Sequence, residues 1–251
     1  MKVVVIGGSG LIGSKLVSRL RDCGHEVVAA SPNTGVNTLT GKGLKEALKG
    51  AEVVVDVSNS PTLDGKAAQE FFEKSGRNLL AAEKAAGVKH HVALSIVGSH
   101  RVTDSAYLQA KAAQEDMIAA ASIPYTIVES TQFFEFIERI AKGSEVDGAY
   151  RLSPALMQPI AAADVVAALV EATLGAPVNG AIEIGGPEAI PLDELARLVI
   201  SARGDPHPII ADAQARYFGA VLNDKSLVPG PKARLGAKRF DDWLRQSITA
   251  D

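Results

Sequence analysis

The chain has 251 residues, 47% of them hydrophobic, and its 26 Lys and Arg residues nearly balance its 29 Asp and Glu residues. This length suits one large α/β domain. The net charge of −3 argues against a nucleic-acid-binding surface. The single cysteine, Cys23, excludes an internal disulfide, and we expect it to be a packed thiol at the end of the first helix. No apolar run could cross a bilayer. With no secretory signal before the first strand, we expect a cytoplasmic protein that has no membrane partner.

The first predicted strand runs into a glycine-rich turn and then a helix. Residues 3–6 are β-branched, and the helix continues with apolar periodicity to Gly24. The spacing Gly8-x-Gly10-x-x-Gly13 matches the dinucleotide fingerprint in the strand–turn–helix context that it requires. We assign the tight turn to Gly8, the approach of the pyrophosphate to Gly10 and close helix packing to Gly13. The predicted phosphate-binding residues are Gly7, Gly8, Ser9, Gly10, Leu11, Ile12 and Gly13.

Strands and helices then alternate through the first half of the chain. Strands are predicted at 26–30, 52–57, 90–95 and 125–128, with a short one at 35–37. Helices are predicted at about 42–49, 65–86 and 105–121. Apolar strands joined by helical crossovers are typical of an α/β fold with a doubly wound parallel sheet, the Rossmann fold.

The second half has a less regular pattern. Residues 133–141 look helical, 143–159 are rich in turn residues, and Asp164 is placed to cap a helix over 165–174. A strand at 181–184 and helices at 192–202 and 240–247 follow. We expect a single NAD(P)-binding domain over 1–251. Its nucleotide-binding core would be about 1–130, and 131–251 would form a small irregular substrate-side region that does not fold independently.

The loop after the second strand bears on the choice of dinucleotide. NAD-selective folds usually place Asp or Glu there to hold the ribose diol. This chain has no acid between the strand and Glu46, while Ser31, Asn33 and Thr34 can donate hydrogen bonds to a 2′-phosphate. These residues favour NADP (NADPH). No arginine accompanies them, so NAD stays an alternative, with a neutral loop that has no strong preference.

One helix carries a pair of residues that could do chemistry. Tyr107 and Lys111 lie four residues apart and share a helix face. An ammonium near a phenol stabilises the phenolate, so Tyr107 could donate a proton to a carbonyl that receives hydride. Ser95, at the end of the preceding strand, could polarise the same oxygen, with Ser99 as the fallback. The alternative is a packed tyrosine beside a lysine that reaches solvent.

The glycine turn, Ser95 and Tyr107-x-x-x-Lys111 together resemble the short-chain dehydrogenase/reductase superfamily. The layout is similar to its atypical branch, the NmrA-like NAD(P)H-binding proteins. The resemblance implies a nicotinamide cofactor and a Ser/Tyr/Lys site in which Tyr107 is the acid/base and Lys111 also contacts the nicotinamide ribose. It further implies cofactor contacts at Ser58, Asn59, Thr131, Gln132 and Phe133.

Three functions follow from these observations. The first is an NADP(H)-dependent oxidoreductase that reduces a small carbonyl or similarly polarised group of a small-molecule substrate. Such an enzyme could be a homodimer. The second is a non-catalytic NADP(H)-binding regulator that reports redox state to a partner. The third, an NAD-dependent epimerase or dehydratase, is disfavoured by the missing ribose acid.

Three further residues, Glu129, His90 and His91, could have either a functional or a purely structural role. Glu129 would either select a cationic substrate or be an ordinary solvated strand end, and the second is favoured because buried unpaired carboxylates are costly. His90 and His91 are adjacent in a strand, so they face opposite sides, and we predict no metal site.

Overall fold

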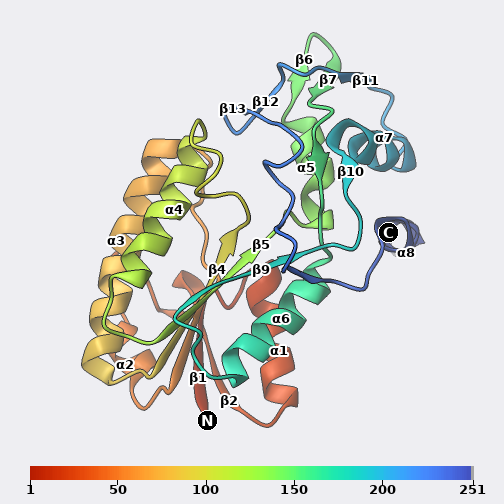
Figure 1. Cartoon of the computed structure of the whole chain (residues 1–251). Coiled ribbons are helices and arrows are strands. Elements are labelled where there is room, and N and C mark those ends of the chain that lie inside the picture. The colour runs from red at the N-terminus through yellow and green to blue at the C-terminus, as the bar shows by residue number, and fades with distance from the viewer. Residues whose placement is uncertain (250–251) are drawn as a thin grey trace.

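The computed structural model describes residues 1–249, and a parallel sheet lies at its centre (Figure 1). Its seven strands pair in parallel in the order β14-β9-β5-β4-β3-β1-β2. The predicted doubly wound parallel sheet is therefore confirmed. The strands are β1 (Lys2–Ile6), β2 (Glu26–Ala30), β3 (Val53–Asp56), β4 (His90–Ile96), β5 (Tyr125–Ser130), β9 (Gly180–Gly185) and β14 (Arg234–Leu235).

Helices cover both faces of this sheet, which explains the long apolar runs in its inner strands. Helices α1 (Leu11–Asp22) and α6 (Ala162–Leu174) lie on one face. Helices α2 (Leu44–Leu48), α3 (Gly65–Ala86) and α4 (Ala106–Ala119) lie on the other (Figure 1). Val3, Val4 and Val5 are fully buried in consequence, because a strand covered on both sides has no solvent-facing positions.

The chain changes direction within the sheet between β1 and β3. After β2 it crosses to the other side of β1, so β1 has β2 and β3 as its neighbours. The loops that follow β1 and β3 leave the same sheet edge toward opposite faces, which is the topological switch point where open α/β sheets bind ligands.

The predicted strand at residues 35–37 is wrong. Residues Pro32–Thr34 form a 3₁₀ turn, η1, which the Ser31 and Thr34 side chains cap reciprocally. Gly35 then takes a left-handed conformation with φ of +86°. These local hydrogen bonds satisfy the backbone that a strand would otherwise have to pair. The sheet consequently passes from β2 to β1 and directly to β3.

Residues 131–249 build the wall above the sheet edge and also contribute β9, β14 and α6 to the sheet layers. The turn-rich stretch contains β6 (Glu145–Val146), β7 (Ala149–Leu152) and β8 (Leu156–Met157). Strand β7 pairs with β6 and β11 (Ile209–Ala211), and β8 pairs with β10 (Ile190–Pro191). The remaining elements are η2 (Phe134–Phe136), α5 (Ile137–Lys142), α7 (Leu192–Ala202), β12 (Arg216–Tyr217), β13 (Ala220–Val221) and α8 (Phe240–Thr249).

Two local expectations need correction. Asp164 does not cap α6, because the helix begins at Ala162 with Ala161 as its first flanking residue. The Asp164 carboxylate instead accepts a hydrogen bond from the backbone N–H of Lys238 (3.0 Å). Cys23 is exposed at the end of α1 rather than packed. Within residues 1–249, no helix has the length and apolar character needed to traverse a bilayer.

Candidate functional site

A cavity of about 1150 Å³ lies at the carboxyl edge of the sheet. It extends from the glycine turn after β1, past the ends of β3, β4 and β5, to α5 and β7. The predicted site residues that line it are Gly7, Ser9, Gly10, Leu11, Ile12, Gly13, Ser31, Ser58, Asn59, Ser95, Tyr107, Lys111, Thr131, Gln132 and Phe133. Gly8, Asn33 and Thr34 are outside its lining. The fold thus brings residues from six separate segments to one cavity.

Gly7 and Gly8 have structural roles in the turn that differ from the prediction. Gly7, not Gly8, has the left-handed conformation that makes the turn, with φ of +78°. A Cβ on Gly8 would lie 2.8 Å from the Cα of Ala29, so Gly8 is needed for packing against β2. A Cβ on Gly13 would overlap the carbonyl oxygen of Gly7, which confirms its predicted role in close helix packing.

The turn and its surroundings fit the phosphates and sugars of a dinucleotide. Among residues 1–249, none accepts a hydrogen bond from the backbone N–H groups of Ser9, Leu11 or Ile12. The first turn of α1 carries no acidic side chain that would repel an anion. Farther along, the buried side-chain oxygens Ser58 Oγ, Thr131 Oγ1 and Gln132 Oε1 have no partner in the described chain. Buried polar atoms are normally paired, so unpaired ones lining a cavity indicate a polar ligand.

The loop after β2 offers less to a 2′-phosphate than the sequence suggests. The Thr34 hydroxyl donates to the carbonyl of Ala29 (2.9 Å) and accepts from the N–H of Ser31 (2.9 Å). Its capacity is therefore used within the η1 turn, and both Thr34 and Asn33 are exposed outside the cavity. Of the three predicted residues only Ser31 lines the cavity. Asn37 and Thr38, which carry no recognisable sequence signal, line it as well.

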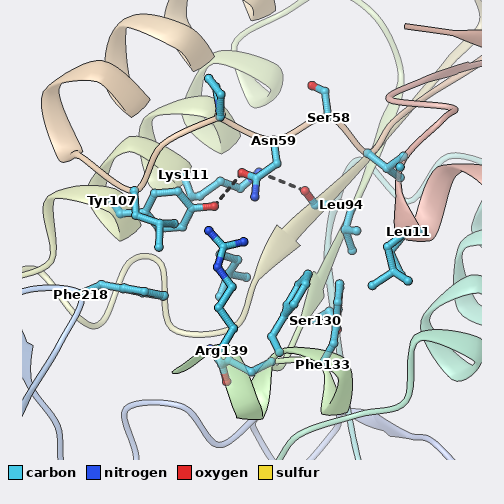
Figure 2. Close-up of a pocket in the computed structure, with 18 of the residues that line it drawn as sticks. Leu11, Ser58, Asn59, Leu94, Tyr107, Lys111, Ser130, Phe133, Arg139 and Phe218 are labelled. Atoms are coloured by element: carbon cyan, nitrogen blue, oxygen red, sulfur yellow. Dashed lines mark hydrogen bonds between the residues drawn. The ribbon is translucent and has the colours of Figure 1, made fainter. Parts of the chain in front are cut away.

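Tyr107 and Lys111 lie on the buried face of α4 and both line the cavity (Figure 2). The Tyr107 hydroxyl donates to Asn59 Oδ1 at 2.7 Å. The Lys111 ammonium donates to the carbonyl of Leu94 (3.0 Å) and to Gln114 Oε1 (2.5 Å). It also lies 4.7 Å from the ring centroid of Phe72. The prediction that the pair points inward is confirmed. Asn59 links it to the loop after β3.

Burial shifts the pKa values of Tyr107 and Lys111. The pKa of Tyr107 is raised, whereas the expected stabilisation of its phenolate would lower it. Desolvation raises the pKa of Tyr107, against the smaller effect of the hydrogen bond to Asn59. Burial lowers the pKa of Lys111 to about 8, although the carboxylates of Asp56 and Glu115 favour its charged form. At neutral pH the tyrosine therefore holds its proton and the lysine is charged. The expected stabilisation of the phenolate by Lys111 does not outweigh desolvation in this state.

Ser95 lies in the predicted place but its hydroxyl is engaged elsewhere. The side chain is 3% exposed and donates to the carboxylate of Glu115 on α4. Ser99 donates to the same carboxylate oxygen at 2.9 Å. Neither hydroxyl proton is directed to Tyr107, because Glu115 is a stronger acceptor and lies beside both serines. Polarisation of a carbonyl by Ser95 therefore stays a prediction.

Glu129 fits neither of its two predicted descriptions. It does not line the cavity, and it is partly buried rather than solvated. Burial and the carboxylates of Glu115 and Glu183 raise the pKa of Glu129 to about 7, while His100 and Arg101 act in the opposite direction. Selection of a cationic substrate by Glu129 therefore has no structural basis in this cavity.

The two adjacent histidines face opposite sides of β4, as predicted. His90 Nε2 hydrogen-bonds with Thr126 Oγ1 (2.9 Å), and His91 Nδ1 with Glu83 Oε1 (2.9 Å). In the described chain, 1–249, no group of three or more His, Cys, Asp or Glu side chains is placed to hold a metal ion.

The far wall of the cavity combines the predicted Phe133 with further aromatic and cationic side chains. Phe133 and Phe136 stack with centroids 5.4 Å apart and line it, whereas Phe134 is core. The centroid of the Phe218 ring lies 5.8 Å from that of the Tyr107 ring. Arg139, Lys142, Arg151 and Arg216 complete this wall. They lie in the irregular second half, where neither periodicity nor motif distinguishes a cavity residue from a surface one.

Comparisons with known proteins bear on the family and the fold of this chain. The photosystem II assembly factor Ycf39 of Synechocystis is 26% identical over 149 residues, 54% of this chain and 46% of its own length. The chain therefore spans about half the length of the curated relatives it matches. A UDP-glucose 4-epimerase from Thermotoga maritima has a TM-score of 0.76 at 17% identity, over 99% of this chain and 98% of its own.

An NAD-bound short-chain dehydrogenase/reductase superfamily protein from Agrobacterium tumefaciens has a TM-score of 0.72 at 16% identity, over 100% of this chain and 97% of its own. The Rossmann fold and the NAD(P)H-binding domain that the resemblance implies are confirmed. The profile of the NAD(P)H-binding family matches residues 7–174, from the glycine turn to the end of α6. With the cavity, its unpaired backbone donors and this match in agreement, the chain belongs to the NAD(P)H-binding family.

Proposed function

We propose that this protein is an NADP(H)-dependent oxidoreductase that reduces a small carbonyl or similarly polarised group, with Tyr107 as the acid/base. The observation that carries the proposal is the placement of Tyr107 and Lys111 on the same cavity as the glycine turn. A tyrosine and a buried ammonium that served only for packing would not need to share a cavity with a dinucleotide site.

The protonation states suit reduction. NADPH, when bound, supplies the hydride that adds to the carbonyl carbon as the C=O π bond breaks. Tyr107 keeps its proton at neutral pH, because burial raises its pKa, and would give that proton to the carbonyl oxygen. The charged Lys111 would then stabilise the phenolate that is left. Ser95 would support the same oxygen once its hydroxyl turned from Glu115.

The preference for NADP over NAD rests on the missing acid after β2. Ser31 lines the cavity there, and no Asp or Glu of the described chain does. A 2′-phosphate would meet no repulsion at this point. We expect NADPH to bind more tightly than NADH in a calorimetric titration. Equal or reversed affinities would contradict this preference without affecting the family assignment.

The role of Tyr107 is tested by turnover with a panel of small carbonyl compounds and NADPH. Replacing the tyrosine by phenylalanine removes the proton donor but keeps the ring, so we expect Tyr107→Phe to lower kcat by about 10²–10⁴-fold with little change in NADPH affinity. Tyr125→Phe removes a hydroxyl on β5 outside the cavity and is the matched control. Full turnover by Tyr107→Phe would exclude the mechanism.

A second candidate is a cofactor-binding regulatory or assembly protein without turnover. The relative Ycf39, whose name describes an assembly factor, favours it over about half the chain. In this case NADPH would bind, Tyr107→Phe would change nothing measurable, and no carbonyl of the panel would consume NADPH. An epimerase or dehydratase role is supported by the fold of the epimerase neighbour alone. Tightly bound NAD in the purified protein would be its signature.

A further inference from the structure

The wall of the cavity has one sign of charge. Its ionisable side chains other than Tyr107 and Tyr217 are all cationic, and in the described chain no Asp or Glu lines it. These cations are Lys111, Arg139, Lys142, Arg151 and Arg216. The chain as a whole has more acidic than basic residues, 29 against 26, so the pattern does not reflect a general excess of basic residues. A cavity lined by one sign of charge attracts ligands of the other sign.

Three of these cations already have partners. Lys111 donates to Leu94 and Gln114, as described above. The Lys142 ammonium lies 2.6 Å from Glu138 Oε1. Arg216 Nη1 donates to the carbonyl of Gly219 at 2.7 Å. Each is thereby restrained by a protein partner.

Arg139 and Arg151 differ from the other three. Within residues 1–249, neither guanidinium takes part in a hydrogen bond or an ion pair. Arg151 is also partly shielded from water. A guanidinium without a protein partner on a cavity wall keeps all its N–H donors for a ligand.

The two arginines come from neighbouring elements at the same end of the cavity. Arg139 lies on α5 and Arg151 on β7, which pack against each other. The backbone N–H of Arg151 donates to the carbonyl of Ser144, just after α5, at 3.1 Å. Figure 2 shows the Arg139 side chain reaching from α5 into the cavity, toward the wall that carries Tyr107 and Asn59.

We propose that the substrate carries an anionic group, a carboxylate or a phosphate, which Arg139 and Arg151 hold while its carbonyl lies at Tyr107. Arginine suits this role because its planar guanidinium pairs with both oxyanions through two parallel hydrogen bonds. The rings of Phe133, Phe136 and Phe218 line the cavity beside these groups and suit an apolar substrate body. The proposal names the substrate class of the site and rests on the proposed function.

The test uses three matched probes: benzoate, phenyl phosphate and the neutral benzamide. Their binding is measured by calorimetry, with and without saturating NADP⁺. With NADP⁺ present the dinucleotide phosphates occupy the glycine turn, so that turn cannot account for anion binding. We expect at least one anion to bind roughly tenfold or more tightly than benzamide, from charge-assisted hydrogen bonds. Whether benzoate or phenyl phosphate binds more tightly distinguishes the carboxylate from the phosphate.

The arginines are tested by substitution. In the double variant Arg139→Gln with Arg151→Gln, we expect the preference for the anion to disappear, and Arg139→Lys to keep part of it. Arg77→Gln, an exposed position on α3 outside the cavity, removes a charge and is the control. Equal binding of benzamide and the anions, no binding of either anion, or an equal loss in Arg77→Gln would overturn the proposal. Anion binding without NADPH oxidation would refute the proposed enzyme but not this anion site.

Discussion

At the scale of single residues, the Lys111 ammonium is a costly group to bury. Its side chain is buried, with 3% exposed, against the ring of Phe72. Two hydrogen bonds and the carboxylates of Asp56 and Glu115 only partly offset desolvation of the ammonium, and its pKa falls to about 8. A buried charge that costs stability persists when function needs it, which makes Lys111 a candidate functional residue on physical grounds.

This cost predicts a pH dependence of stability. The folded state releases the Lys111 proton near pH 8, whereas the unfolded chain holds it up to about 10.5. Between these values the unfolded state binds more protons, so the stability of the wild type should rise with pH, by up to roughly 3 kcal/mol. Lys111→Met keeps the length without the charge and should lack this rise.

Urea unfolding at pH 7.5 and pH 10 measures the difference between the two proteins. As the pH increases, the free energy of unfolding of the wild type should increase relative to that of Lys111→Met. Lys84→Met, at an exposed position near the end of α3, should follow the wild type. A constant difference between wild type and Lys111→Met would show that burial does not perturb the lysine.

At the scale of elements, the glycine turn and α1 separate packing from ligand contact. Gly13 permits the helix to cross close to the turn, since a side chain there would overlap the Gly7 carbonyl. Gly10 has more room, because a Cβ would lie 3.3 Å from the same oxygen and meet no other atom within 4 Å. The two glycines of one motif therefore meet different physical demands.

Alanine substitutions should separate these demands. We expect Gly13→Ala to lower the free energy of unfolding by about 1–3 kcal/mol, because the backbone must shift to relieve the overlap. Gly10→Ala should change stability by less than about 1 kcal/mol yet weaken dinucleotide binding roughly tenfold or more, because its methyl group blocks the pyrophosphate. Gly180→Ala on β9, where a Cβ meets only Val178 at 4.0 Å, is the control. Unchanged affinity in Gly10→Ala would contradict the assigned phosphate site.

At the scale of the whole molecule, the last helix braces the cavity wall. The Phe240 ring on α8 packs against the rings of Phe134 and Trp243, with ring centroids 5.2 Å and 5.8 Å apart, respectively. Phe134 lies in η2, between Phe133 and Phe136, which line the cavity. Packing of the end of the chain thus positions residues just after β5.

Loss of the Phe240 ring should destabilise the cavity wall. Phe240→Ala deletes a ring that is 1% exposed, so we expect a loss of about 3–5 kcal/mol and faster amide hydrogen exchange over residues 131–142. Ile248→Ala on the same helix removes a side chain that is 41% exposed and should have little effect on either measurement. Unchanged exchange in Phe240→Ala would show that α8 does not support the wall.

Features of this protein that depend on a local sequence pattern could be predicted from the sequence. Strand periodicity and crossover lengths predicted the parallel sheet, and the glycine spacing in its strand–turn–helix context predicted the dinucleotide site. The helix period placed Tyr107 and Lys111 on one buried face. The glycine spacing could not distinguish Gly7 from Gly8 as the left-handed residue, because it allows either. Only the packing of β2 against Gly8 decides between them.

The sequence alone determined the fold class, the cofactor family and the inward Tyr107–Lys111 pair, because each is encoded in residues close together along the chain. Only the tertiary structure showed that Glu115 engages Ser95, that Asn59 accepts from Tyr107, and that Arg139 and Arg151 face the cavity. These relations join residues about 12 to 48 positions apart. No local period connects such residues, and the sign of a pKa shift depends on burial that packing alone creates.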